Sequence, residues 1–542
     1  MTEAVTVVMG QIDPVVGDID GNVHRIIKAA EQAKDQFHAD IIVFPEMTLL
    51  GYPPEDLLLR NGLYPQIEQA LGKLCDELND IVCVVGYPMM DDLGERFNMA
   101  AWIHKGTIKA SYIKQNLPNY SVFDEQRYFT EGHQPCVIEY KGIRFGLLIC
   151  EDIWKISPCT QAKEAGAEVI LNLNASPFSE EKHQDRIATL QRRVDEIKRP
   201  IIYVNQVGGQ DDLVFDGGSF AISSTGEVMV QSPQFEKALT AVKLEKQVDS
   251  VEVMQGEQAQ IFHGEARIYE ALKLGVYDYV SKNGFPGVLL GLSGGIDSAL
   301  TLAIAVDALG ADKVEAVMMP FRYTADISKE DAAKQAETMQ VSYHTVPIEP
   351  MYEAFEQSLA PLFAGKSEDL TEENLQARIR GTLLMALSNK NGKMVLATSN
   401  KSEVSVGYST LYGDMVGGFS PLKDVPKTLV YRLAKYRNSL SPVIPERVIT
   451  RPPSAELRPD QVDQDSLPDY DVLDEIIRLF VKQDKTPQQI IELGFDPEEV
   501  NKVIRLINVS EYKRRQSAPG IKITQRAYGR DRRYPITSRY SE

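Results

Sequence analysis

The chain has 542 residues, of which 43% are hydrophobic and 25% are charged, so it has the composition of a folded globular protein and is long enough for two domains. Its formal net charge of -19 argues against nucleic acid as a partner, because phosphate backbones attract basic surfaces. No apolar run approaches the roughly 20 residues that span a bilayer, and the N-terminus lacks the pattern of a secretory signal, so we expect a cytoplasmic protein without membrane contact.

Two patterns of predicted elements follow each other along the chain. In residues 1–245, short apolar runs such as DIIVFPE and IRFGLLICEDIW alternate with amphipathic stretches such as NVHRIIKAAEQAKDQ, which predicts a layered α/β domain. The polar residues 246–264 are expected to form a linker. From residue 265 to 542, strand-like runs and long helical stretches alternate, which predicts a parallel sheet with crossover helices.

Cysteine usage in the first domain excludes two kinds of site. The five cysteines stand at positions 75, 83, 136, 150 and 159, and no two of them form a CxxC pair. Neither a disulfide framework nor a zinc site is therefore indicated.

Three residues of the first domain are candidates for catalysis. Glu46, Lys114 and Cys150 each end an apolar, strand-like run, so each is expected at the rim of a sheet, where α/β folds bind ligands. Taken singly, they could also be a loop acid, a surface charge and a buried strand cysteine. Taken together, they supply a nucleophilic thiol, a base for its proton and a cation for a developing oxyanion.

The motifs around these residues resemble a known family. FPE, IKQNLPNYSVFDEQRYF and LLICEDIW are similar to the nitrilase/amidase superfamily, and most of all to the glutaminase domain of glutamine-dependent NAD synthetases. The resemblance implies an α-β-β-α sandwich over residues 1–245. It also implies that Glu46 is the general base, that Lys114 stabilises the tetrahedral intermediate, and that Cys150 forms a glutamyl thioester. By the same resemblance, the glutamine-binding residues are Tyr120, Glu125, Ser176 and Lys182.

The stretch SGGIDSA opens a predicted helix in the second domain and differs from a Walker A loop, since it has no lysine. Backbone amides at a helix N-terminus can still bind phosphate. Asp297 would repel a phosphate unless a cation stands between them, so we predict that Asp297 is a Mg²⁺ ligand. The alternative is a glycine-rich turn that starts an ordinary helix.

The same loop resembles the pyrophosphate loop of the ATP pyrophosphatases, which implies a Rossmann-like parallel sheet. NLQARIRGTLLMALSN, LATSNKSEVSVGYSTLYGDMVGG and KRRQSAPGIKITQRAYGRDRRYPIT are similar to the NAD synthetases within that group. The resemblance implies that ATP is bound by Gly291, Leu292, Ser293, Gly294, Gly295, Ile296, Asp297, Ser298, Thr398 and Lys427. It implies that deamido-NAD is bound by Asn374, Arg378, Glu403, Asp414 and Lys513. Glu403 is expected beside Asp297 as a second Mg²⁺ ligand.

The two resemblances together imply one reaction. L-glutamine supplies ammonia, ATP adenylates deamido-NAD, and the products are NAD, AMP, pyrophosphate and glutamate. The alternatives are another glutamine-dependent amidotransferase of the ATP pyrophosphatase type, and an amidase fused to a nucleotide-sensing module.

Three further expectations concern the whole chain. A homo-oligomer built from dimers of the second domain is expected, with an octamer as one closed arrangement. The proline-rich residues 441–470 are expected to form a long loop that serves as a lid. The basic residues from Glu511 onward are either a solvated tail or a site for an anionic ligand.

Overall fold

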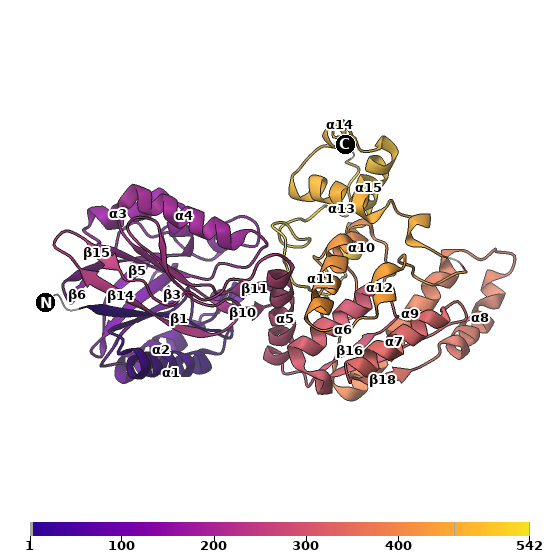
Figure 1. The fold of residues 1–542 in the computed structure, drawn as a ribbon, viewed down its shortest axis with the longest axis horizontal. Helices are drawn as coiled ribbons and strands as arrows, with labels where there is room; N and C mark the ends of the chain where they lie inside the picture. Colours follow the sequence, from indigo (N-terminus) through magenta and orange to yellow (C-terminus); the bar gives the residue numbers. More distant parts are fainter. Residues whose placement is uncertain (1–3, 460, 541–542) are drawn as a thin grey trace. The chain divides into compact units, whose positions relative to one another are not determined.

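A computed structural model describes residues 4–459 and 461–540, and its chain divides into two units between Phe262 and His263 (Figure 1). Each unit mixes helices with sheets, so the α/β class expected from the sequence is confirmed.

Two sheets form the centre of the first unit. One sheet has the strand order β15-β14-β1-β2-β3-β4-β5, and the other has the order β13-β12-β9-β8-β7-β6. The strands of the first sheet are β1 (Val5–Gln11), β2 (Ile41–Val43), β3 (Val82–Met90), β4 (Arg96–His104), β5 (Thr107–Ile113), β14 (Ala238–Lys246) and β15 (Val251–Val253). Those of the second are β6 (Val137–Tyr140), β7 (Ile143–Ile149), β8 (Val169–Asn174), β9 (Ile201–Asn205), β12 (Phe220–Ile222) and β13 (Val228–Gln231). A separate hairpin joins β10 (Val207–Gln210) to β11 (Leu213–Asp216).

Helices cover the outer faces of both sheets. Figure 1 shows α1 (Ile19–Phe37) and α2 (Leu63–Glu77) on one side of the strands, and α3 (Ile156–Glu164) and α4 (Lys182–Ile197) on the other. This is the α-β-β-α sandwich that the resemblance implied. Short 3-10 turns connect the elements: η1 (Glu55–Leu59), η2 (Glu125–Arg127) and η3 (Cys150–Trp154).

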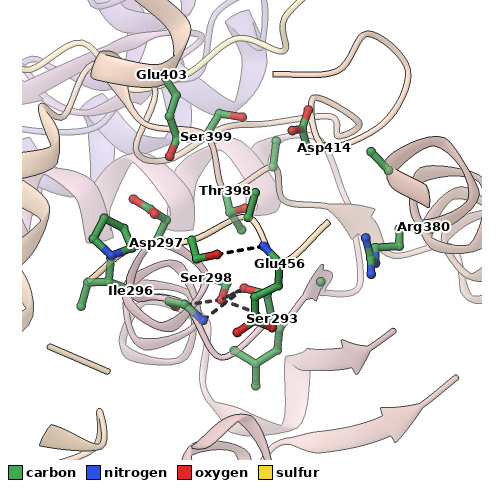
Figure 2. Close-up of a pocket in the computed structure, with 18 of the residues that line it drawn as sticks. Ser293, Ile296, Asp297, Ser298, Arg380, Thr398, Ser399, Glu403, Asp414 and Glu456 are labelled. Carbon is green, nitrogen blue, oxygen red and sulfur yellow. Dashed lines mark hydrogen bonds between the residues drawn. The ribbon is translucent and has the colours of Figure 1, made fainter. Parts of the chain in front are cut away.

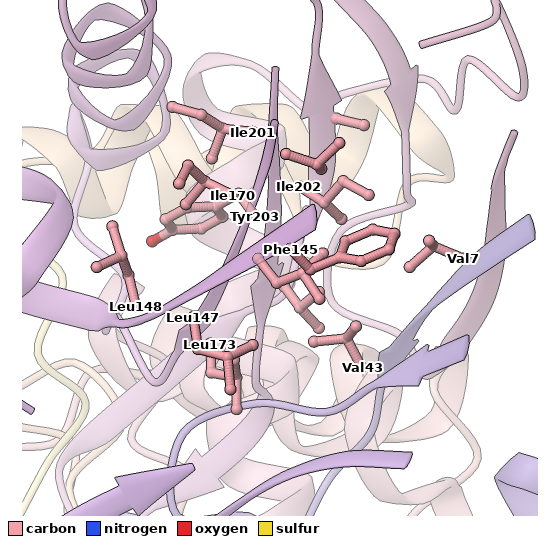
Figure 3. Close-up of a cluster of buried hydrophobic side chains, with 14 of the residues drawn as sticks. Val7, Val43, Phe145, Leu147, Leu148, Ile170, Leu173, Ile201, Ile202 and Tyr203 are labelled. Atoms are coloured by element: carbon pink, nitrogen blue, oxygen red, sulfur yellow. The ribbon is translucent and has the colours of Figure 1, made fainter. Parts of the chain in front are cut away.

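Apolar side chains of the two sheets pack against each other in the middle of the sandwich. Figure 3 shows Val7 and Val43 from the first sheet facing Phe145, Leu147 and Leu173 from the second. All six residues of β8 are buried, because helices cover one face of this sheet and the other sheet covers the second face. This two-sided burial explains why the central strands read as continuous apolar runs rather than as alternating ones.

The residues expected as a linker are partly regular. Within 246–264, Val251–Val253 form β15, which pairs antiparallel with β14 of the first sheet. The location of the domain boundary stays a prediction.

In the second unit, four parallel strands have the order β18-β17-β16-β19. The elements that build this layer are α5 (Gly264–Lys282), β16 (Val288–Gly291), α6 (Ile296–Leu309), η4 (Ala311–Lys313), β17 (Val314–Met318), α7 (Asp326–Thr338), β18 (Ser342–Thr345), α8 (Glu349–Phe363), α9 (Leu370–Asn391) and β19 (Met394–Val395). The chain runs outward from β16 to β18 and then returns to place β19 on the other side of β16. This reversal creates a switch point between β16 and β19, where open α/β sheets bind ligands at the carboxyl ends of the strands.

The elements described after β19 are all helical. They are α10 (Lys401–Val406), α11 (Lys427–Leu440), α12 (Glu446–Thr450), η5 (Asp463–Asp465), α13 (Tyr470–Ile477), the π-helical η6 (Arg478–Lys482), α14 (Pro487–Glu492), α15 (Pro497–Val509) and α16 (Glu511–Arg514). The stretch 441–470, expected as a loop, therefore contains α12 and η5. Among the helices that the structure describes, none is both long and apolar enough to cross a bilayer.

The basic C-terminal segment uses several of its charges inside the fold. Lys522 pairs with Asp531 at 2.5 Å, and both Arg526 and Arg532 pair with Asp484. The Lys522 pair lies within the segment, whereas Arg526 and Arg532 attach the segment to Asp484 elsewhere in the second unit, so these cations do not form a freely solvated tail.

Candidate active sites

The three candidate catalytic residues of the first unit come from the ends of three strands. Glu46 follows β2, Lys114 follows β5, and Cys150 follows β7 directly as the first residue of η3. Cys150 has φ of 43°, a left-handed conformation that non-glycine residues rarely adopt. The backbone therefore turns sharply from strand to helix at the thiol.

A buried charge cluster surrounds Lys114. Its ammonium nitrogen Nζ lies 2.7 Å from Glu46 Oε1 and 2.7 Å from Glu125 Oε2, and the side chain has no exposed surface. Asn98 Nδ2 donates to Glu46 Oε1 at 2.7 Å, and the hydroxyl of Tyr52 donates to Glu125 Oε1 at 2.8 Å. The cation is therefore shared by two carboxylates, each of which also accepts a hydrogen bond from another side chain.

The charges of this cluster act on Cys150. Burial, then Glu46, raises the pKa of the Cys150 thiol, and Lys114 opposes that rise. Burial works to lower the pKa of Lys114, but Glu125 and Glu46 together raise it well above its ordinary value, so the ammonium stays charged. A thiol with a raised pKa needs a nearby base before it can attack, and the role of Glu46 as that base stays a prediction.

Glu125 is a second acid beside the three candidate residues. It is buried against Lys114 and Tyr52, and burial raises the pKa of its carboxyl to about 7. It belongs to the charge cluster around Lys114, and the resemblance also counted it among the glutamine-binding residues. Its role in glutamine binding stays a prediction.

The other expected glutamine-binding residues lie around the thiol. The Tyr120 hydroxyl donates to Glu151 Oε2 at 2.9 Å, and the Lys182 ammonium lies 4.0 Å from the ring centre of Trp154. Burial, then Arg186, lowers the pKa of Lys182, and the charge of Cys150 acts on it in the opposite direction.

Ser176 is held by a residue that the sequence reading missed. Arg186, fully buried, donates from Nε to Ser176 Oγ at 3.2 Å and pairs with Asp216 at 2.8 Å. Burial works to lower the pKa of Arg186, but Asp216 raises it overall. Because the local pattern of α4 only indicates an amphipathic helix, no sequence signal distinguished Arg186 from its neighbours.

In the second unit, a cavity of about 340 Å³ lies at the switch point of the sheet. Figure 2 shows Asp297, Thr398, Glu403 and Arg380 around it. The expected residues that line it are Gly291, Leu292, Ser293, Gly295, Ile296, Asp297, Ser298, Thr398, Glu403, Asp414 and Lys427. Residues separated by more than 100 positions in the sequence therefore meet here, because β16 and β19 are neighbours.

The glycine-rich loop is held in one conformation by its own side chains. Ser293 Oγ lies 3.1 Å from Ser298 Oγ, and the backbone amide of Gly295 donates to Ser293 Oγ at 3.2 Å. Gly294 has φ of +80°, and a Cβ added there would lie 2.3 Å from the carbonyl oxygen of Ser328. Gly294 is thus required for the close approach of the loop to α7, although it does not line the cavity.

Two carboxylates lie close to one lysine at the N-terminus of α6. Lys427 Nζ lies 2.5 Å from Asp297 Oδ2 and 3.4 Å from Glu403 Oε1, and Asn400 Nδ2 donates to Asp297 Oδ1 at 2.9 Å. Burial, then Asp297, raises the pKa of Glu403 to about 8. Two ionised carboxylates carry two negative charges, and Lys427 supplies one positive charge, so the site would hold net negative charge.

The expected dinucleotide-binding residues gather on the segment 407–414. Lys513 Nζ donates to the carbonyl oxygens of Gly407 and Ser409, each at 2.7 Å. The carboxamide oxygen of Asn374 accepts from Thr410, and Arg378 Nε donates to the Leu411 carbonyl at 3.2 Å. Asn374, Arg378 and Lys513 do not line the cavity, so their contact with a dinucleotide stays a prediction.

The lining residues that were not expected include Arg380, Arg451 and Glu456. Arg380 donates from Nε to the Met319 carbonyl at 3.0 Å, and burial lowers its pKa to about 10. Arg451 Nη2 donates to the carbonyl of Gly294 at 2.7 Å, and Glu456 accepts from Ser328 Oγ at 2.5 Å. Arg451 and Glu456 belong to the stretch expected as a lid, which is therefore attached to the glycine-rich loop and to α7.

Comparisons with known proteins assign a family to each unit. Residues 6–251 match the carbon-nitrogen hydrolase family, and residues 268–517 match the NAD synthase family. The chain is 53% identical to a glutamine-dependent NAD(+) synthetase from Acinetobacter baylyi, with 98% of each chain covered. It is 42% identical to one from Aquifex aeolicus, with 98% of this chain and 99% of that protein covered.

Two solved structures have the same fold over nearly the whole chain. The glutamine-dependent NAD+ synthetase from Acinetobacter baumannii, in complex with adenosine diphosphate, aligns with a TM-score of 0.81 and 51% identity, covering 98% of each chain. A glutamine-dependent NAD(+) synthetase from Cytophaga hutchinsonii aligns with a TM-score of 0.84 at 22% identity, covering 99% of this chain and 98% of that one.

Proposed function

The chain belongs to the glutamine-dependent NAD(+) synthetases, and from that premise we propose that Glu46, Lys114 and Cys150 release ammonia from glutamine while the cavity beside Asp297 adenylates deamido-NAD. The overall reaction is the ATP-dependent amidation of deamido-NAD to NAD with nitrogen from glutamine. The single observation that carries the assignment of residues is the fully buried Lys114 ammonium, which joins two carboxylates near Cys150, a residue with a strained backbone.

In the first unit, Glu46 accepts the thiol proton and the Cys150 sulfur attacks the amide carbon of glutamine. Lys114 faces the oxygen that becomes negative in the tetrahedral intermediate. Glu46 then returns the proton to the leaving nitrogen, and ammonia departs as the carbon–nitrogen bond breaks. A water molecule hydrolyses the resulting thioester to glutamate, with Glu46 accepting its proton and the thiol re-forming.

The site around Cys150 supports this sequence of steps. Tyr120, Ser176 and Lys182 lie on different elements around the thiol, so a substrate there is contacted from several sides. Because Lys182 is partly desolvated and stacks on Trp154, its charge is available to an anionic group of the substrate.

In the second unit, the cavity is proposed to hold ATP and the reacting end of deamido-NAD. The adenosine diphosphate bound to the Acinetobacter baumannii relative supports an adenine nucleotide as the occupant. The loop from Gly291 to Ser298 ends at the N-terminus of α6, where backbone amides favour phosphate oxygens. Thr398, which follows β19, lines the same cavity.

Asp297 and Glu403 are proposed as Mg²⁺ ligands, and the donor set fits that ion. Within the described residues, no group of three or more His, Cys, Asp or Glu side chains is arranged to hold a metal. Mg²⁺ commonly takes one or two carboxylates and completes its shell with substrate phosphates and water. When bound, the ion would neutralise charge on the leaving pyrophosphate. The raised pKa of Glu403 agrees with a site that lacks positive charge.

The division of labour is tested by two variants and two nitrogen sources. Cys150→Ala should abolish NAD formation from glutamine and leave the ammonium-dependent rate unchanged, because only the first unit needs a thiol. Asp297→Asn should abolish both routes while it spares the glutamate release that is measured without ATP and deamido-NAD. The rates of NAD and glutamate formation are followed in parallel with the parent chain. If Cys150→Ala keeps the glutamine route or loses both routes, the proposed division is wrong.

The chain is also proposed to form a homo-oligomer larger than a dimer. Both types of domain are expected to self-associate, and two kinds of interface on one chain generate a closed ring by symmetry.

A further inference from the structure

Asp152 is a buried carboxylate that the steps above do not use. It lies within η3, two residues after Cys150, and has no exposed surface. Its two oxygens accept five hydrogen bonds from residues of three different segments. An isolated buried charge is costly, so a carboxylate in this position requires such a complete set of donors.

The donors lie on both sides of the catalytic cluster. Oδ1 accepts from the backbone amides of Gln115 and Asn116 at 3.2 and 2.8 Å, and from Asn116 Nδ2 at 3.0 Å. Oδ2 accepts from the Tyr112 hydroxyl at 2.9 Å and from the backbone amide of Ile149 at 3.1 Å. Gln115 and Asn116 follow Lys114 directly, Tyr112 precedes it in β5, and Ile149 precedes Cys150.

The geometry points to Asp152 as the positioning residue that sets where Lys114 lies relative to Cys150, an inference that rests on the proposed roles of those two residues. Lys114 and Cys150 belong to different sheets, so the packing of one sheet on the other would leave their separation adjustable. One carboxylate that binds the residues next to both removes that freedom. Displacements of about 1 Å at a reacting pair can cost a factor of about 100 in rate, which makes such a brace valuable.

Only an ionised carboxylate fits this set of partners. Every partner donates a hydrogen, and four of the five are N–H groups that have no acceptor to offer in exchange. Burial raises the pKa of Asp152, and the hydrogen bonds from Asn116 oppose that rise by favouring the charged form. The carboxamide introduced by Asp152→Asn would direct its own N–H groups at one cluster of donors in either orientation. The substitution keeps the shape of the side chain and breaks the brace.

The test compares Asp152→Asn with a matched control in the same unit. The control is Asp40→Asn, because Asp40 also joins separate segments, by accepting from the Thr6 amide at 2.9 Å and pairing with Lys141 at 2.8 Å. Asp40 precedes β2, at the end opposite to Glu46. Glutamate release is measured over a range of glutamine concentrations, and NAD formation is measured with ammonium.

We expect Asp152→Asn to lower kcat for glutamine by about 10- to 100-fold with KM within about threefold of the parent, because a misplaced cation acts on the transition state. The ammonium-dependent rate should equal that of the parent. The rate at which iodoacetamide alkylates Cys150 is measured by peptide mass analysis, with Cys150→Ala as the background. In Asp152→Asn this rate should be lower, and its dependence on pH should be shifted. Asp40→Asn should change neither kcat nor alkylation.

A role limited to folding predicts a lower melting temperature with normal alkylation below it, and that result would overturn the inference. A kcat within about twofold of the parent, or a rise in KM alone, would overturn it as well. If Asp152→Asn fails to fold, Tyr112→Phe decides, since it removes one donor and keeps the ring. It should lower kcat by a smaller factor of about 3 to 10 with KM unchanged, and a parent-like kcat there counts against the inference.

These outcomes are distinct from a failure of the proposed function. If Cys150→Ala retains the glutamine route, the proposed function itself is wrong. If Cys150→Ala loses that route and Asp152→Asn does not, only the positioning role is wrong.

Discussion

At the scale of single residues, Arg380 stands out in the synthetase cavity because burial lowers its pKa to about 10. Its Nε donates to a carbonyl, and within the part of the chain that the structure describes no acid pairs with its guanidinium at ion-pair distance. Glu456 and Asp414 attract it only from a longer range. A desolvated guanidinium of this kind is poised to bind an anionic or hydrogen-bond-accepting group of a ligand.

We predict that Arg380→Ala raises KM for ATP or deamido-NAD by about 10- to 100-fold, the loss expected for a hydrogen bond to a charged group. Because the charge is unpaired, its removal should leave the melting temperature of the free protein unchanged or higher. Both substrates are varied in steady-state assays with ammonium as the nitrogen source. An unchanged KM for each substrate, together with a lower melting temperature, would assign Arg380 a structural role instead.

Glu125 should impose a pH dependence on the stability of the first unit. Its pKa in the folded chain is about 7, above the ordinary value of 4.5, so the folded chain holds the proton more tightly than the unfolded chain does. The resulting stabilisation is complete below pH 4.5 and is lost as the pH rises through about 7.

We therefore predict that Glu125→Gln lessens the fall in melting temperature between about pH 5 and pH 8 that the parent chain shows. Melting curves across that range, recorded without ligands, measure the slope. Glu131→Gln, at an exposed position, serves as the control and should follow the parent. A parent-like slope in Glu125→Gln would contradict the shift.

At the scale of elements, β3 supports the turn that carries Glu46. Gly86 lies in β3, and a Cβ added there would lie 2.4 Å from the backbone nitrogen of Met47 and 2.9 Å from the Pro45 carbonyl oxygen. Both neighbours are backbone atoms, which cannot move aside as a flexible side chain can. The strand and the turn therefore approach each other closely only because residue 86 is a glycine.

We predict that Gly86→Ala displaces Glu46 and lowers the glutamine-dependent rate by about 10-fold or more, with a loss of about 1–3 kcal/mol in stability. The ammonium-dependent rate should be retained. Gly72→Ala is the matched control, because a Cβ at that exposed position of α2 meets nothing within 4 Å and should stabilise the helix by about 0.5–1 kcal/mol. Rates with both nitrogen sources and melting curves of the two variants are compared. A glutamine rate equal to that of the parent in Gly86→Ala would refute the proposed close contact.

At the scale of the whole molecule, the two reactions are expected to be coupled. Hydrolysis of glutamine without an acceptor wastes it, so ATP and deamido-NAD should favour the conformation of the chain that is active as a glutaminase. The residues Arg451 to Leu457, which line the cavity and contact the glycine-rich loop, are the element through which ligand binding could act.

We predict that glutamate release rises several-fold when ATP and deamido-NAD are both present, and that the chain behaves in solution as a homo-oligomer larger than a dimer. Glutamate release is measured with neither, one and both ligands, and the mass is measured by light scattering. Asp297→Asn should weaken the response to the ligands. A monomer whose glutaminase rate ignores both ligands would contradict both parts of the prediction.

The family and the reaction could be predicted from the sequence because their signals are local. SGGIDSA places its glycines, serines and Asp297 within one turn between a strand and a helix, and CEDIW does the same for Cys150. Residues that are neighbours in the sequence can take only a few relative positions, so a short motif predicts its own local geometry. The α/β class of both units could also be predicted, because buried strands and amphipathic helices have different periodicities in the sequence.

The tertiary structure alone decided which distant side chains meet and which do not. Lys427 reaches Asp297 across 130 positions, and Asp152 reaches Asn116 across 36, while Asn374, Arg378 and Lys513 hold the segment 407–414 and do not line the cavity. No periodicity or spacing encodes these contacts, because they depend on strand order and on the packing of the two sheets. In the sequence, nothing distinguishes Arg186, Arg380 and Asp152 from ordinary helix or turn residues. Their charges matter because the tertiary structure removes them from water, and an unpartnered charge away from water is costly.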